Sequence, residues 1–243
     1  IPLMKITYKS ISLNVVFNKK ELLEKDAIVF LHGFTGSISD WEFLINKLPV
    51  KFTPIFIDLV GHGESDSPTS VVYYTSQFQT QLLENIFKSL ELRRFYICGY
   101  SMGGRLALTY AMEYPNRLKG LILESTNFGI DKINKRIERL RSDEKLAEQL
   151  KKTSVEEFIS YWMQTPIFSS LKNLEVEKFN ELKKNKIINN NITGLSNSLL
   201  GFSTGKMENY FKKLKDFRVK TMLIVGENDK KFVKLSAVSY THL

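Results

Sequence analysis

The chain has 243 residues, 43% of them hydrophobic and 25% charged, a balance that suits one globular domain with its own core. No apolar run is long enough to span a membrane, and the single cysteine excludes an internal disulfide and indicates a reducing, cytoplasmic location. The net charge of +9 comes from basic residues scattered among acidic ones, without a nucleic-acid motif, so we expect no nucleic-acid partner.

Five short apolar runs predict strands of a parallel sheet that is buried on both faces. They lie at residues 27–31, 54–57, 95–98, 118–123 and 221–225, after two shorter strands expected between residues 5 and 17. Helical patterns separate several of them, at residues 40–48, 74–90 and 105–113. Strands that alternate with helices predict an α/β fold, a mostly parallel sheet with helices on both faces.

The alternation stops between residues 127 and 217, where the periodicity is helical. Within this stretch, Thr153 to Glu156 has the pattern of a capping box and predicts a helix that runs through Trp162. Helices inserted here would lie over the strand ends, where open α/β sheets bind ligands. We therefore expect a core of residues 1–126 and 218–243 and a helical lid of residues 127–217.

Gly99-Tyr100-Ser101-Met102-Gly103 matches the nucleophile-elbow pattern G-x-S-x-G, between a predicted strand and a predicted helix. In an elbow, a sharp turn presents the serine hydroxyl above the sheet. Glycines are needed on both sides because the strand and helix backbones come close together. Ser101 is therefore the predicted nucleophile, and a tight turn with a purely structural role is the alternative.

A second loop, His32-Gly33-Phe34-Thr35-Gly36, follows the strand at residues 27–31. In elbow-type enzymes this loop supplies one backbone N–H of an oxyanion hole, and the residue after the nucleophile supplies the other. These roles fall to Phe34 and Met102. We expect His32 to fix the loop rather than to act as a base, and His62 to be structural as well.

The acid that orients a catalytic histidine follows the nucleophile in the chain. Asp229, just beyond the last predicted strand, is the predicted acid, and Glu227 and Glu124 are alternatives. His242 follows Asp229 too closely for the helix, strand and loop expected between them. We therefore expect the chain to stop before its catalytic histidine and before the last strand and helix of the core. Such a chain would be inactive and would associate through an open strand edge.

Together these motifs resemble the α/β-hydrolase superfamily and, within it, the MenH family, the 2-succinyl-6-hydroxy-2,4-cyclohexadiene-1-carboxylate (SHCHC) synthases of menaquinone (vitamin K2) biosynthesis. The resemblance extends from about Met4 to Phe232. In the core it rests on residues 31–41, 58–68, 99–105 and 226–232, and in the expected lid on residues 139–143, 161–171 and 194–206. Arg105 and the lid motifs are the more selective features.

The resemblance implies a lyase that eliminates pyruvate from a small polycarboxylate, with the triad serine abstracting a proton and without a metal or other cofactor. It assigns substrate binding to Arg105, Arg141, Trp162, Tyr100 and Lys186. Arginine suits bidentate carboxylate binding, and Arg105 lies one helical turn after Ser101. The family has a further basic lid residue near Ile187, where this chain departs from it and offers only Lys183, Lys184 and Lys186. A surface charge at Arg105 and a core position for Trp162 are the alternatives.

Two other functions fit the same motifs. A serine esterase or carbon–carbon bond hydrolase would use the same Ser101, Asp229 and oxyanion hole, and would form an acyl-enzyme that water cleaves. A non-catalytic binding domain that has lost its histidine is the other alternative. Pyruvate release, compared with the turnover of neutral p-nitrophenyl esters, separates the lyase from the esterase.

Overall fold

The computed structural model describes residues 3–240 as a seven-stranded sheet in the order β1-β2-β4-β3-β5-β6-β7. The strands are β1 (Leu3–Tyr8), β2 (Ile11–Phe17), β3 (Asp26–Leu31), β4 (Phe52–Ile57), β5 (Phe95–Tyr100), β6 (Leu118–Glu124) and β7 (Thr221–Ile224). β2 runs antiparallel to both β1 and β4, and the pairs from β4 through β7 are parallel. The predicted α/β fold with a mostly parallel sheet is confirmed.

The central strands of this sheet are buried on both faces, and successive side chains along each strand point to opposite faces. On β3, Val29 and Leu31 enter the larger core, whereas Ile28 and Phe30 pack on the opposite face with Trp41. The elements that cover the sheet are α1 (Ser76–Ser89) and α2 (Met102–Glu113) on the first face and the 3-10 helix η2 (Ile38–Leu44) on the second.

η2 differs from the regular helix predicted at residues 40–48. Its hydrogen bonds span three residues, as from the Asp40 N–H to the Ser37 carbonyl (3.1 Å). Pro49 disfavours helical geometry at the preceding residue, so the segment ends in tight turns. The remaining 3-10 helices are η1 (Glu21–Leu23), η3 (Val71–Tyr74), η4 (Pro115–Arg117), η5 (Pro166–Asn173) and η6 (Phe211–Asp216).

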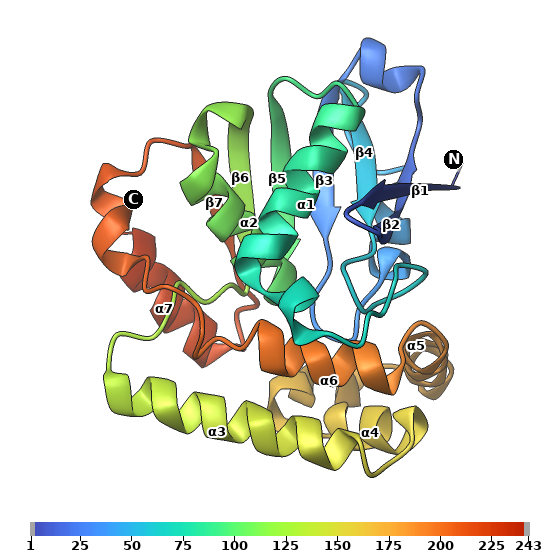
Figure 1. The fold of residues 1–243 in the computed structure, drawn as a ribbon, viewed down its shortest axis with the longest axis vertical. Coiled ribbons are helices and arrows are strands. Elements are labelled where there is room, and N and C mark those ends of the chain that lie inside the picture. Colours follow the sequence, from blue (N-terminus) through green and yellow to red (C-terminus); the bar gives the residue numbers. More distant parts are fainter. Residues whose placement is uncertain (1–2, 241–243) are drawn as a thin grey trace.

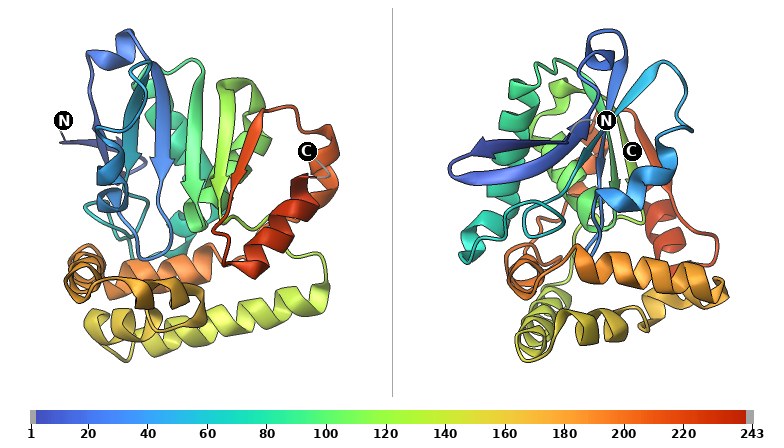
Figure 2. Two further views of the ribbon diagram at one scale, coloured as in Figure 1. Left: turned by 180° about the vertical axis from the view of Figure 1, so that it is seen from behind. Right: turned by 90° about the vertical axis from the view of Figure 1, so that its right-hand side faces the viewer.

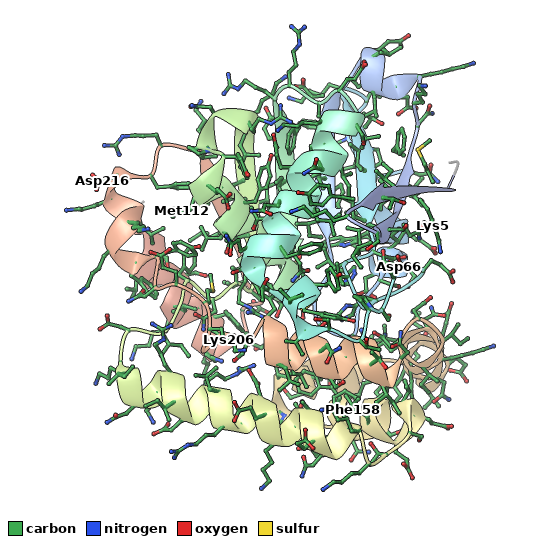
Figure 3. The ribbon with its side chains drawn as sticks, in the orientation of Figure 1. Lys5, Asp66, Met112, Phe158, Lys206 and Asp216 are labelled. Atoms are coloured by element: carbon green, nitrogen blue, oxygen red, sulfur yellow. The ribbon has the colours of Figure 1, made fainter. Side chains whose placement is uncertain are left out.

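Four α-helices between β6 and β7 lie below the carboxyl ends of the strands (Figure 1). They are α3 (Ile133–Leu150), α4 (Val155–Trp162), α5 (Val176–Ile188) and α6 (Ile192–Gly201), called here the helical layer. The layer lies against the same end of the sheet in both views of Figure 2, and it has a buried cluster of its own that includes Phe158, labelled in Figure 3. No helix within residues 3–240 is both long and apolar enough to cross a membrane.

The capping box of α4 is shifted by one residue from its predicted position. The Ser154 hydroxyl accepts the Glu157 N–H (3.1 Å), and the Glu157 carboxylate accepts the Ser154 N–H (2.9 Å). Thr153 instead donates its hydroxyl to carbonyls at the end of α3. Thr153-Ser154 followed by Glu156-Glu157 offers two equivalent registers, which the sequence alone does not distinguish.

β7 pairs with β6 and with no further strand within the described residues. Two apolar side chains on one of its faces, Met222 and Ile224, are 59% and 42% exposed. The chain then continues into α7 (Lys230–Tyr240), whose Phe232 is buried.

Candidate active site

Ser101 lies at the sharp turn between β5 and α2. Its backbone φ is +51°, and its N–H donates to the Glu124 carbonyl on the neighbouring strand (2.9 Å). A Cβ at position 99 would lie 2.5 Å from the Gly103 carbonyl oxygen, and one at position 103 would lie 2.2 Å from the Leu31 carbonyl oxygen. Both glycines are therefore required by close backbone contact, as in a nucleophile elbow.

The two predicted oxyanion donors, Phe34 and Met102, line the same cavity as Ser101. Neither backbone N–H has a hydrogen-bond acceptor within the described part of the chain. Thr35 follows Phe34 in this loop and has a φ of +64°. Hydrogen bonds to its carbonyl hold the loop in place. The Thr35 carbonyl accepts a hydrogen bond from the Asn190 side-chain amide (3.0 Å) and a longer one from the Lys186 ammonium (3.4 Å).

The cavity in front of Ser101 has a volume of about 110 Å³ and lies between the core and the helical layer. Its charged lining consists of Arg105, Arg139, Asp143 and Lys231. Hydroxyl and amide groups from the strand ends and from the segment after α6 complete its polar surface. A serine at a strand end is thus combined with cations in one enclosed space.

Arg105 is a buried cation in this cavity, with 9% of its surface exposed. Its Nη1 donates to the Phe202 carbonyl (2.6 Å), and its guanidinium carbon lies 4.4 Å from the centroid of the Phe202 ring. Burial and then the positive charge of Arg139 lower the pKa of Arg105 to about 9, against the opposing effect of Asp143. A buried guanidinium with neutral partners favours the binding of an anion, and its planar fork suits a carboxylate.

The arginine that the helical layer contributes to this cavity is Arg139, whereas the predicted Arg141 is exposed and does not line it. Two positions apart on a helix are separated by about 200° of rotation, so the two side chains point in nearly opposite directions. The buried residues of α3 are Asp143, Ala147 and Leu150, and Arg139 lies one turn before the first of them. That spacing is visible in the sequence and is the signal that identifies Arg139.

The other predicted binding residues are divided between two cavities. Trp162 lines the Ser101 cavity with its ring edge-on to Phe34, at 5.3 Å between centroids. Tyr100 and the buried Lys186 line a neighbouring cavity of about 430 Å³. Ile167 borders both cavities.

The second cavity carries groups of both charges. Burial raises the pKa of Asp40 and of Glu124, and it raises the pKa of Tyr100 to about 12. Lys186 supplies a cation beside them. Glu124, the alternative acid, therefore lies on the Tyr100 side of the elbow and not in the Ser101 cavity.

Asp229, the predicted acid, lies at the start of α7. Its Oδ1 accepts the Phe232 N–H (3.1 Å) and caps the helix. Lys231 and Phe232, just beyond it, line the Ser101 cavity, whereas Asp229 itself does not. Asp229 is thus close in sequence to residues that line the site, but its carboxylate is used to cap the start of α7.

His32, fully buried, has both ring nitrogens engaged. Its Nδ1–H donates to the Gly33 carbonyl (2.8 Å), its Nε2 accepts the Leu59 N–H (2.9 Å), and burial lowers its pKa to about 4. His62 packs against it at 5.1 Å between ring centroids, and burial, followed by the nearby His32, lowers the pKa of His62 to about 3. Both are structural in this arrangement, and His242 lies outside the described residues.

No three His, Cys, Asp or Glu side chains gather as metal ligands within residues 3–240. The groups that do converge are a serine hydroxyl, two free N–H donors and two guanidiniums. They suit chemistry at a carbon close to a carboxylate, either acyl transfer or proton abstraction.

Comparison with known proteins gives three findings. The model of the alpha/beta hydrolase fold family matches residues 26–243. The chain is 40% identical over 211 residues to the putative SHCHC synthase of Bacillus subtilis (strain 168), covering 87% of this chain and 76% of that protein. The structure of MenH from S. aureus is similar with a TM-score of 0.85 and 31% identity, over 93% of this chain and 85% of that one.

Proposed function

The chain belongs to the alpha/beta hydrolase fold family and, within it, to the SHCHC synthases, and we propose that it carries out their reaction in menaquinone biosynthesis. In that reaction, pyruvate is eliminated from 2-succinyl-5-enolpyruvyl-6-hydroxy-3-cyclohexene-1-carboxylate. A ring carbon–hydrogen bond and the carbon–oxygen bond to the enolpyruvyl group break, and a ring double bond forms. The enolpyruvyl group leaves with a proton as pyruvate, so neither water nor a redox partner is consumed.

The observation that carries this proposal is the pair of guanidiniums beside Ser101. Arg105 and Arg139 line the Ser101 cavity, and Asp143 is the one acidic residue among its lining residues. A pocket for a neutral ester gains nothing from a buried arginine, which is costly to desolvate. A substrate with several carboxylates repays that cost through charged hydrogen bonds.

The residues then have the following roles. Once its hydroxyl is deprotonated, Ser101 removes the ring proton. Asp229 is the acid that would orient a histidine that takes up the serine proton, and the buried His32 and His62, both bonded to the backbone, do not supply that histidine. The N–H groups of Phe34 and Met102 stabilise the negative charge that develops on a substrate oxygen. Trp162 packs against the ring.

The substrate extends through both cavities. The Ser101 cavity, of about 110 Å³, is smaller than the 300–1,000 Å³ typical of ligand pockets, and the second cavity adds about 430 Å³. Arg105 and Arg139 bind one carboxylate, and Tyr100 and Lys186 bind a second one on the far side of Ile167. The helical layer acts as the lid that closes over the ring.

The cellular location that fits this proposal is the cytoplasm. Cys98 is a free, buried thiol, and burial raises its pKa to about 12, which keeps it unreactive. The partner of the protein is then a small polycarboxylate rather than a nucleic acid.

The test is the release of pyruvate by the native protein and by Ser101→Ala. We expect the variant to lose activity by several powers of ten, because Ser101 is the one hydroxyl lining the cavity that lies at the elbow turn. Ser160→Ala, on the exposed side of α4, is the control and should keep full activity. A Ser101→Ala variant that folds and releases pyruvate at the wild-type rate would remove the serine from the mechanism.

A further inference from the structure

Asp143 is the most heavily engaged polar side chain of the helical layer. It is 4% exposed, and its two oxygens accept the Arg139 Nε–H at 3.0 and 2.9 Å. The Ser203 hydroxyl donates to the same carboxylate (2.6 Å) from a segment 60 residues further along the chain. One buried carboxylate therefore joins α3 to the segment that leads from α6 back to the core.

The contact with Arg139 fixes how that arginine faces the cavity. Asp143 uses only the Nε–H, so the two terminal nitrogens, with four further N–H donors, stay available. The Arg139 side chain is 41% exposed and would otherwise sample many rotamers in solvent. Held by Asp143 one turn away on the same face of α3, it lines the Ser101 cavity.

The contact with Ser203 fixes the partner of the other guanidinium. The Ser203 hydroxyl also accepts the Gly205 N–H (3.0 Å), and the Gly205 carbonyl accepts the Arg136 Nε–H (3.2 Å). A Cβ at position 205 would lie 2.7 Å from Leu140, so this turn packs closely on α3. Phe202, the residue before Ser203, provides the carbonyl and the ring that hold Arg105.

We propose that Asp143 is a positioning residue, which holds both Arg139 and, through Ser203, the Phe202 support of Arg105, and so sets the affinity of the site for a substrate carboxylate. This inference rests on the proposed function. Asp143 neutralises only one of the two guanidiniums, so the site keeps a net positive charge that can bind one anion. In this role Asp143 acts through the arginines rather than by binding the substrate itself.

The test compares Asp143→Asn and Ser203→Ala with Glu144→Gln, which removes an exposed carboxylate from the same helix. The readouts are the KM and kcat of pyruvate release and the Kd of the SHCHC product, followed by quenching of tryptophan fluorescence. For Asp143→Asn we expect KM and Kd to rise about tenfold or more, because charged hydrogen bonds to Arg139 are lost, with kcat changed less than about threefold. For Ser203→Ala a rise of about threefold is expected, and none for Glu144→Gln.

A double-mutant cycle separates positioning from a general structural effect. If Asp143 acts mainly through Arg139, Asp143→Asn adds no more to the KM of Arg139→Gln than the roughly threefold that its second route, through Ser203, carries. Ser203→Ala leaves the buried Asp143 carboxylate paired with Arg139. It replaces Asp143→Asn as the test variant if Asp143→Asn lowers the melting temperature. A KM within twofold of the wild type for both variants, or fully additive effects in the cycle, would overturn the inference alone. A wild-type protein that neither releases pyruvate nor binds the product would overturn the proposed function, and this inference with it.

Discussion

Arg139 and Arg141 are the same residue type on one helix, but the Arg139 side chain lines the Ser101 cavity and the Arg141 side chain is exposed to solvent. Replacing Arg139 by Ala should raise the KM for the polycarboxylate by about 10- to 100-fold, since one charged hydrogen-bonding partner is lost. Arg141→Ala is the matched control and should stay within about twofold, because surface changes rarely exceed 0.5 kcal/mol. Steady-state assays of pyruvate release measure both. Equal effects of the two substitutions would mean that the charge of α3, and not a particular side chain, attracts the substrate.

Gly103 and Gly226 form a second matched pair, for stability. A methyl group at position 103 meets backbone atoms of β3 at 2.2 Å, whereas one at position 226 meets nothing within 4 Å. Gly103→Ala should lower the free energy of unfolding by about 1–3 kcal/mol through overpacking. Gly226→Ala should change it by less than about 0.5 kcal/mol. Urea denaturation of the two variants provides the measurement, and a Gly103→Ala protein as stable as the wild type would contradict the packing of the elbow.

At the scale of single residues, the sequence predicts which residue types are needed better than it predicts which cavity each side chain faces. The G-x-S-x-G pattern specifies the serine and both glycines because backbone contact admits no other residue there. Nothing in residue type indicates that Lys186 and Tyr100 face one cavity while Trp162 and Arg105 face another. That division depends on how the helical layer lies on the sheet.

Among the elements, the short connection between α5 and α6 supports the oxyanion loop from the helical layer. Asn190 donates to the Thr35 carbonyl, which fixes the strained peptide next to Phe34. Asn190→Ala should therefore lower kcat about tenfold, less than the loss expected from removing an oxyanion donor itself.

KM should stay close to the wild-type value in this variant, because Asn190 does not line the Ser101 cavity. Asn189→Ala is the control, since the Asn189 side chain makes no hydrogen bond within the described residues. The measurement is the kcat of pyruvate release for both variants. An unchanged kcat for Asn190→Ala would show that the loop keeps its geometry without the helical layer.

The five strands β3 to β7 could be predicted at element scale because each contains a short apolar run, the pattern that a sheet buried on both faces requires. The helical layer could be predicted only as helical. Its order and its contacts with the core depend on side chains distant in sequence, such as Ser203 with Asp143. The predicted capping register of α4 and the regular helix predicted in place of η2 were wrong, because the local sequence patterns there fit two conformations.

For the whole molecule, the buried histidines predict how stability depends on pH. Burial lowers the pKa of His32 to about 4 and that of His62 to about 3, below the ordinary value of 6.5, so unfolding takes up protons in acid. Their contribution is present above pH 6.5 and is lost as the pH falls toward the folded values. Between pH 7 and 5 each should remove about 2 kcal/mol from the free energy of unfolding.

Urea denaturation at several pH values measures this loss, and His62→Gln should reduce its slope by about half. A free energy of unfolding that stays constant between pH 7 and 5 would show that the histidines are not buried in their neutral form.

The central claim is that the cavity in front of Ser101 selects a polycarboxylate for elimination rather than a neutral ester for hydrolysis. The most direct measurement is kcat/KM of the native protein for pyruvate release from 2-succinyl-5-enolpyruvyl-6-hydroxy-3-cyclohexene-1-carboxylate, compared with its kcat/KM for p-nitrophenyl butyrate. We predict a preference on the order of 10³ for the polycarboxylate, and a loss of 10- to 100-fold in that reaction alone for Arg105→Ala, because two charged contacts act on one substrate only. Efficient turnover of the neutral ester without release of pyruvate would contradict the account.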